Sequence, residues 1–273
     1  MCICKGEEMM SSVIETSVGV YHSQYNRLMK NIPFTLTQLI EKHHIIIAGG
    51  SITSVFSGME INDFDLYPLT KASYDNFVKD IDEKMQANKK KSPSNWGLLC
   101  NSPNALTYKY DGVVIQVISK FCDVNSLVYN PNLSATDLIE SFDFTVCMGA
   151  LDYKEQKFVL YENFLQDVCQ RKLVFNVKSA YPVCALYRVS KYINKGYKIS
   201  GGEAIKLALS IHNLEMNNYK DLKEQLLGID TVDFIDITES LIENKGKDAP
   251  IDFKETMDLI ERSLSAIWEP NED

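Results

Sequence analysis

The first part of the chain alternates between strand and helix patterns. Phe34–His43 has the apolar spacing of a helix, and the apolar run in His44–Gly49 (HIIIAG) predicts a buried β-strand. A short helix is expected from Gly50 to about Phe56. In Asp63–Leu69 (DFDLYPL) polar and apolar residues alternate at first, which predicts a second strand. Before these elements, Ser12–Met29 is expected to form one helix, an N-terminal extension of the domain.

The next stretch continues the mixed pattern. Ala105–Lys120 predicts a hairpin whose turn is Asp111-Gly112, a strong two-residue turn signal. Two further strands are expected in Asp143–Tyr153 and Lys157–Glu162. From about Ser179 to Trp268 the pattern is mostly helical.

These patterns predict an α/β (α+β) fold in two domains. We expect a mixed-sheet head domain over residues 1–175, including the N-terminal helical extension, and a helical domain over residues 176–273. The sequence shows no internal repeat and no low-complexity linker.

Composition narrows the class of protein. Of the 273 residues, 45% are hydrophobic and 24% are charged, which is typical of a soluble globular protein. The net charge of −9 argues against nonspecific wrapping of a long nucleic acid, although a local basic surface is not excluded. The seven cysteines form no CxxC pair, so a zinc site is not expected. With no apolar run of about 18 residues, we expect no membrane association and a cytoplasmic or otherwise reducing location.

The first candidate site follows the strand His44–Gly49. A strand that turns directly into a helix leaves backbone N–H groups unpaired at the helix N-terminus, and these groups bind phosphate. Gly49 and Gly50 allow a ligand to approach the backbone closely, and Ser51 adds a hydroxyl donor. Gly-Gly-Ser is also an ordinary turn, so two interpretations stay open at this point.

The second candidate site is the pair of carboxylates Asp63 and Asp65. Alternate residues of a strand share a face, so both aspartates should point one way while Phe64 and Leu66 point into the core. Two nearby carboxylates suit Mg²⁺, although such a pair is also common on solvated surface. Together with the glycine turn, the pair indicates metal-assisted phosphoryl chemistry on a nucleoside triphosphate.

Four motifs in order then resemble a known family. They are GGSITSVFSGMEINDFDLY (Gly49–Tyr67), IQVISK (Ile115–Lys120), SFDFTVCMGALDY (Ser141–Tyr153) and YPVCALYRVSKYINKGYKI (Tyr181–Ile199). Together they resemble the DNA polymerase beta-like nucleotidyltransferases. The similarity is greatest to the class II tRNA nucleotidyltransferase and bacterial poly(A) polymerase branch.

The resemblance implies an activity and a set of site residues. The expected activity is metal-dependent transfer of a nucleoside monophosphate from an NTP onto an acceptor hydroxyl, with an RNA 3′ end as the first candidate acceptor. Asp63 and Asp65 would be the catalytic and metal-binding residues, with Mg²⁺ or Mn²⁺ as the cofactor. The nucleotide-binding residues would be Gly49, Gly50, Ser51, Asp143, Arg188 and Lys191.

The chain also departs from the family pattern. Ser141 and Phe142 stand where the family has two arginines, and Gln116 stands where it has a glutamate. The helix from Pro182 to Tyr197 carries a basic stripe of Arg188, Lys191 and Lys195, which is either a phosphate-contacting wall or a solvated face. Two alternatives therefore stay open: the same fold acting on a protein or small molecule, or a catalytically silent nucleotide-binding or scaffold protein.

Overall fold

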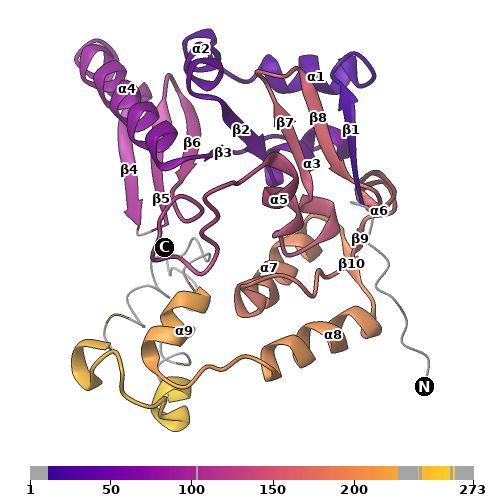
Figure 1. The fold of residues 1–273 in the computed structure, drawn as a ribbon, viewed down its shortest axis with the longest axis vertical. Coiled ribbons are helices and arrows are strands. Elements are labelled where there is room, and N and C mark those ends of the chain that lie inside the picture. The colour runs from indigo at the N-terminus through magenta and orange to yellow at the C-terminus, as the bar shows by residue number, and fades with distance from the viewer. Residues whose placement is uncertain (1–11, 103, 227–238, 240–241, 259–260, 262–273) are drawn as a thin grey trace, which may run out of the picture. The chain divides into compact units, whose positions relative to one another are not determined.

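The computed structural model describes residues 12–102, 104–226, 239, 242–258 and 261 (Figure 1). The chain divides into two compact units, Met1–Ala180 and Tyr181–Asp273. No helix in the described part is long and apolar enough to cross a membrane.

The first unit is built on a mixed sheet. Eight strands of the described residues pair in the order β1-β8-β7-β2-β3-β6-β5-β4. The pair β3 and β6 is parallel, and the other pairs are antiparallel. The strands are β1 Val13–Ser17, β2 Ile45–Ala48, β3 Phe64–Pro68, β4 Gly97–Ser102, β5 Ala105–Tyr110, β6 Val113–Ile118, β7 Gly149–Asp152 and β8 Lys157–Tyr161.

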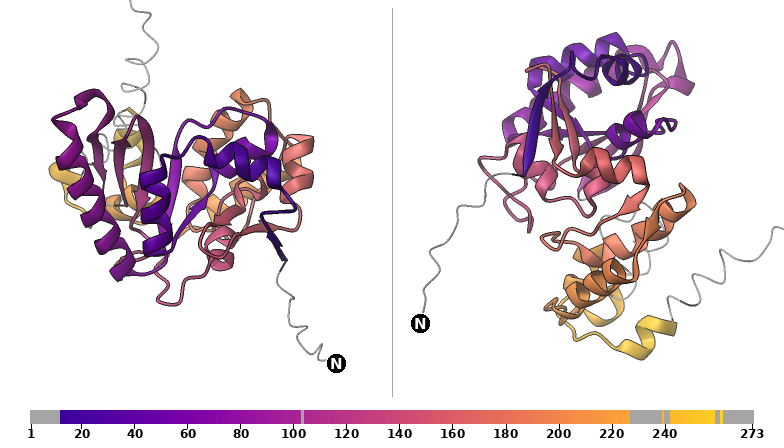
Figure 2. Two further views of the ribbon diagram at one scale, coloured as in Figure 1. Left: turned by 90° about the horizontal axis from the view of Figure 1, so that it is seen from above. Right: turned by 90° about the vertical axis from the view of Figure 1, so that its right-hand side faces the viewer.

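Helices connect these strands and continue into the second unit. The first unit contains α1 His22–Met29, α2 Phe34–His43, α3 Gly50–Ser57, α4 Lys71–Lys89, α5 Ala135–Glu140 and α6 Phe164–Gln170, the short helical turns η1 Pro93–Asn95 and η2 Thr145–Cys147, and the short strand β9 Lys172–Leu173. The second contains α7 Pro182–Asn194, β10 Lys198–Ile199, α8 Gly201–His212 and α9 Tyr219–Leu226. Figure 2 shows the same elements from two further sides.

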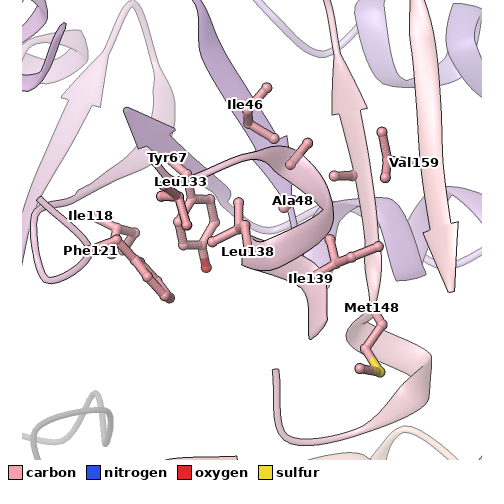
Figure 3. Packing of buried hydrophobic residues seen from close by; sticks show 12 residues of the cluster. Ile46, Ala48, Tyr67, Ile118, Phe121, Leu133, Leu138, Ile139, Met148 and Val159 are labelled. Atoms are coloured by element: carbon pink, nitrogen blue, oxygen red, sulfur yellow. The ribbon is translucent and has the colours of Figure 1, made fainter. Parts of the chain in front are cut away.

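One face of the sheet packs against α5. Ile46 and Ala48 of β2, Tyr67 of β3, and Leu138 and Ile139 of α5 belong to one buried apolar cluster (Figure 3). The N-terminus of α5 is held by a capping box, in which the Ser134 side chain accepts from the Asp137 N–H and the Asp137 side chain accepts from the Ser134 N–H. Because Tyr67 belongs to the apolar cluster, the face of β3 that carries Tyr67 lies toward α5.

The opposite face packs against α3 and α6. A Cβ atom on Gly149 of β7 would lie 3.0 Å from Ile52 of α3 and 2.9 Å from Phe164 of α6, so a side chain here would displace these two residues. The next residue, Ala150, belongs to the cluster under α5. Because successive residues of a strand face opposite ways, α3 and α6 cover the face opposite α5.

The predicted fold class is confirmed, since the described residues combine an eight-stranded mixed sheet with helices, and the second unit is mostly helical. The expected helix over Ser12–Met29 is wrong in its first half, where β1 pairs antiparallel with β8 and only α1 is helical. Pairing with a distant strand overrides a weak local preference. The strand expected over Asp143–Tyr153 is shorter, because η2 precedes β7.

Candidate functional site

The glycine turn joins β2 to α3. Gly49 has φ 78° and ψ −132°, a combination that only glycine adopts readily. Its N–H donates to the Gly149 carbonyl at 3.0 Å, and its own carbonyl accepts from the Thr53 N–H at 3.1 Å. A Cβ atom here would lie 3.4 Å from Oδ2 of Asp65 and 3.8 Å from Cε2 of Phe142. The turn therefore brings the backbone, a carboxylate and an aromatic ring to one point.

Helix α3 begins at this turn with unused donors. No side chain in the described part of the chain caps its N-terminus, and the first N–H groups of a helix have no partner within the helix. The Ser51 side chain is only 2% exposed, and its Oγ has no hydrogen-bond partner among the described residues. A buried hydroxyl without a partner costs about 1–3 kcal/mol. A phosphate oxygen bound at the helix N-terminus would supply acceptors of the kind these donors lack.

Asp65 lies on β3 beside this turn. It pairs with Ala48 of β2 on one side and with Gln116 of β6 on the other. Its neighbours Phe64 and Leu66 are buried at 2% and 0% exposure, which confirms the predicted alternation. Asp65 itself is half-buried, on the face of the sheet that carries α5.

Asp63 lies one residue before the strand begins. The sequence predicts a strand from Asp63, whereas β3 starts at Phe64. The position of Asp63 is therefore set by the connection that follows α3 and not by the ladder of the sheet. Its side chain is half-buried.

Gln116 is the nearest polar neighbour of Asp65 in the ladder. The parallel register of β3 and β6 places these two residues side by side, and their side chains share a face. Thr107 of β5 pairs with Gln116 in turn, so Asp65, Gln116 and Thr107 form a row across three neighbouring strands. The row thus contains one carboxylate and two neutral polar side chains.

The carboxylate groups of Asp63 and Asp65 are suitable ligands for a magnesium ion that binds together with a phosphate substrate. Within the described ranges, no group of three or more His, Cys, Asp and Glu side chains is placed to hold a metal. Asp65 offers hard carboxylate oxygens beside the N-terminus of α3, and Asp63 lies two residues before Asp65 in the chain. Mg²⁺ typically takes one or two carboxylates and completes its shell with water and phosphate oxygens.

Phe142 occupies the other side of the glycine turn. Its half-buried ring lies 5.6 Å from the Tyr67 ring, centroid to centroid. Ser141, the residue before it, donates its hydroxyl to the Leu138 carbonyl at 2.6 Å and so closes the end of α5. The sequence identifies these two positions only as lacking a charge, while the structure places Phe142 at the site itself.

Asp143 is buried and holds the segment that follows β9. Its carboxylate accepts from the Ser179 hydroxyl at 2.8 Å, and its carbonyl accepts from the Asn176 N–H at 2.8 Å. The exposed fraction of Asp143 is 5%. These contacts are structural, and the expected contact of Asp143 with a nucleotide stays a prediction.

Asn176 is a residue that sequence reasoning missed. Its side-chain Nδ2 donates to the Glu140 carbonyl at 2.7 Å and to the Phe142 carbonyl at 2.8 Å. It thereby fixes the backbone on which the Phe142 ring stands. No motif marks Asn176, because its partners are main-chain atoms more than thirty residues earlier in the chain.

Arg188 and Lys191 lie on α7 in the second unit. Arg188 is half-buried and Lys191 is exposed, and Lys195 lies 5.8 Å from the centre of the Tyr192 ring. Leu186, Val189 and Ile193 have the spacing of an apolar helix face. Leu186 and Ile193 are nevertheless 53% and 50% exposed, whereas Cys184 and Ala185 are buried. The buried face of α7 is thus not the face that this spacing indicates. A phosphate contact by Arg188 and Lys191 stays a prediction.

Solved structures resemble this chain in fold. A CCA-adding enzyme in complex with CTP matches with a TM-score of 0.50 and 10% identity, over 92% of this chain and 56% of that one. The Thermotoga maritima CCA-adding enzyme complexed with tRNA matches with a TM-score of 0.48 and 12% identity, over 92% and 55% of the two chains. At such low identity the likeness shows the fold alone. It confirms the predicted resemblance to the class II tRNA nucleotidyltransferase branch at that level.

Sequence comparison gives a closer relationship. Gabija anti-defense 2 of Bacillus phage SPbetaL7 is 31% identical over 240 residues, which cover 88% of this chain and 54% of that protein. The chain thus spans about half the length of the curated relative. The model of the family described as Gabija anti-defense 2 family protein matches residues 20–171. Because this match spans more than half of the 273 residues, the chain belongs to the Gabija anti-defense 2 family.

Proposed function

We propose that this protein is a metal-dependent nucleotidyltransferase that moves a nucleoside monophosphate from an NTP onto an acceptor hydroxyl. The observation that carries this proposal is the junction at Gly49. There the N-terminus of α3, the buried Ser51 hydroxyl and the Asp65 carboxylate come together, and among the described residues neither the helix end has a side-chain cap nor the hydroxyl a hydrogen-bond partner. This is the combination needed to hold a polyphosphate and a cation side by side.

Each part of the site has a role in the proposed reaction. Gly49 and Gly50 let the β- and γ-phosphates approach the backbone, where the N–H groups of α3 and the Ser51 hydroxyl donate to them. Asp63 and Asp65 would hold Mg²⁺ or Mn²⁺. When bound, the metal would favour ionisation of the acceptor hydroxyl and offset charge on the leaving pyrophosphate. In the transfer, the hydroxyl oxygen forms a bond to the α-phosphorus and the bond from that phosphorus to pyrophosphate breaks.

The rest of the nucleotide would be contacted from other elements. Asp143, Arg188 and Lys191 are the proposed contacts, in line with the motifs Ser141–Tyr153 and Tyr181–Ile199. The first candidate acceptor is an RNA 3′ end, and the reaction would take place in the cytoplasm, where NTP and Mg²⁺ are both plentiful. Membership of the Gabija anti-defense 2 family supports a role of this transfer in counteracting the Gabija defence.

Specific observations favour two other functions. The net charge of −9 favours a protein or small-molecule acceptor over RNA. The neutral Gln116 beside Asp65 and the apolar Phe142 beside Gly49 favour a catalytically silent nucleotide-binding protein. All three functions use the same site, so one experiment can separate them.

The experiment is transfer of label from NTPs. The full chain is incubated with Mg²⁺, total RNA and cell protein, using NTPs labelled at the α-phosphate in one arm and at the γ-phosphate in the other. The proposal expects α-label, and not γ-label, to enter RNA or protein. It also expects Asp63→Asn with Asp65→Asn to abolish this transfer. Asp75→Asn, an exposed aspartate paired with Lys71 on α4, serves as the matched control and should leave transfer unchanged.

The outcomes distinguish the candidates. Label in protein or a small molecule identifies the acceptor as other than RNA. Binding of NTP without transfer to any fraction would favour the silent protein, and equal transfer by the double variant would remove Asp63 and Asp65 from the mechanism.

A further inference from the structure

The Phe142 ring lies where a substrate bound at Gly49 and Asp65 would meet it. The point that a Gly49 Cβ would occupy is 3.4 Å from Asp65 Oδ2 and 3.8 Å from Phe142 Cε2. The carboxylate and the ring edge therefore border the same small space. The ring is half-buried, so part of its surface remains accessible.

The ring is held in place by two kinds of contact. It packs on Tyr67, whose ring lies 5.9 Å from that of Phe121, so the three rings form a row on the α5 face of the sheet. The backbone that carries the ring is held by Asn176, whose Nδ2 donates to the Phe142 carbonyl at 2.8 Å and to the Glu140 carbonyl at 2.7 Å. A ring fixed before binding loses little conformational freedom when a ligand packs against it.

The chemistry of the ring selects which part of a nucleotide it can contact. A phenyl ring neither donates hydrogen bonds nor carries a positive charge, so it gives no favourable contact to a phosphate. Its flat apolar surface suits a nucleobase or the carbon face of a ribose. Tyr67 and Phe121 lie in the same row but are 8% and 3% exposed. Phe142 is therefore the member of the row that a ligand can reach.

We propose that Phe142 is the surface against which the nucleoside part of the substrate packs, so that the site selects nucleoside triphosphates over other polyphosphates. This inference rests on the proposed function and specifies the substrate of the same site. An apolar ring packs against the flat surface of the nucleoside and makes no hydrogen bonds to the edge of the base. Phe142 should therefore favour all four NTPs to a similar degree.

The test compares two ligands that differ by the nucleoside. Calorimetry measures the binding of Mg²⁺ with a non-hydrolysable NTP, and of Mg²⁺ with inorganic tripolyphosphate, to the full chain. Phe142→Leu should weaken NTP binding about tenfold and leave tripolyphosphate binding unchanged. Phe142→Tyr, which keeps the ring, should retain NTP binding.

Phe121→Leu is the matched control for disturbance of the aromatic row. It removes a ring that packs on Tyr67 but is buried away from solvent, so the affinity for NTP should stay as in wild type. Thermal unfolding of each variant checks that the fold is retained.

The results separate the inference from the proposed function. Equal NTP affinity for wild type and Phe142→Leu, or an equal loss for both ligands, overturns the role of Phe142 while the proposed nucleotide site stands. A wild-type chain that binds neither ligand overturns the proposed function and this inference together.

Discussion

At the scale of single residues, Gly49 and Gly50 have different reasons to be glycine. Gly49 has a positive φ of 78°, and a Cβ there would lie 3.4 Å from Asp65 Oδ2. Gly50 starts α3, and a Cβ there would have no atom within 4 Å among its described surroundings. The sequence shows two equivalent glycines, and the backbone conformation that separates them is visible only in the structure.

This difference predicts unequal effects of alanine. Gly49→Ala should lower the free energy of unfolding by about 1–3 kcal/mol, because alanine is strained at this φ and ψ. Gly50→Ala should be neutral or slightly stabilising, because alanine favours the helix. Urea unfolding of both variants measures the difference, and equal stabilities would contradict the conformation described for Gly49.

Gln116 is the second residue whose role depends on the structure. The register of β3 and β6 places it beside Asp65, so Gln116→Glu would add a carboxylate next to this proposed metal ligand. We expect this variant to lower the Mg²⁺ concentration needed for half-maximal NTP turnover, because an added negative charge attracts the cation. It should also destabilise the metal-free protein, because two adjacent carboxylates repel each other.

Gln116→Met is the matched control, since it keeps the length of the side chain without a charge. A Mg²⁺ titration of turnover compares the three proteins. Identical Mg²⁺ dependence in wild type and Gln116→Glu would place Gln116 outside the metal site.

At the scale of elements, α2 and α4 are joined by an acid-sensitive contact. The Lys42 ammonium and, next, the His43 ring, both at the end of α2, hydrogen-bond to the Asp80 carboxylate on α4 and lower the pKa of Asp80 below its usual 3.8. A carboxylate whose pKa is lowered by folding stabilises the fold at pH values above the pKa that the same group has in the unfolded chain. This stabilisation is lost as the pH falls through the folded-state pKa.

The contact predicts a pH-dependent difference between wild type and Asp80→Asn. The variant should be less stable by about 1 kcal/mol at neutral pH, and the difference should shrink as the pH falls below 3.8. Denaturant unfolding at several pH values measures it. A difference that stayed constant down to pH about 2 would show that charge on Asp80 does not stabilise the helix pair.

Local patterns predict some elements and miss others for physical reasons. The strand before Gly49, the alternation around Asp65 and the hairpin at Asp111-Gly112 are confirmed, because each depends on a short run of residues. Strand β1 is not predicted, because it exists through pairing with β8, which lies more than a hundred residues later. The neighbourhood of Asp65 and Gln116 likewise depends on a long-range parallel pair.

The residues of the candidate site fall into the same two groups, those that a local pattern predicts and those that depend on long-range contacts. Gly49, Ser51, Asp63 and Asp65 can be found from sequence because they lie in one strand-turn-helix-strand segment. The contact of Phe142 with this segment needs the sheet to bring residue 142 back to β2 and β3. Asn176 acts through main-chain carbonyls, which leave no signature in the sequence.

At the scale of the whole molecule, the family match covers the proposed metal and phosphate site. The match over residues 20–171 begins after β1 and includes β2 to β8 together with α1 to α6. The proposed ligands Asp63 and Asp65, the glycine turn and Phe142 all lie inside it. Arg188 and Lys191 of α7, which are also proposed nucleotide contacts, lie outside it. The family match therefore covers the proposed metal and phosphate site but not every proposed nucleotide contact.

The central claim is that this site binds a nucleoside triphosphate with a metal held by Asp63 and Asp65. The most direct test is calorimetry of a non-hydrolysable NTP with the full chain, with and without Mg²⁺. The claim predicts binding that requires Mg²⁺ and that weakens by at least about tenfold in Asp63→Asn with Asp65→Asn, while Asp75→Asn binds as wild type. NTP binding of equal affinity without Mg²⁺, or in the double variant, would contradict it.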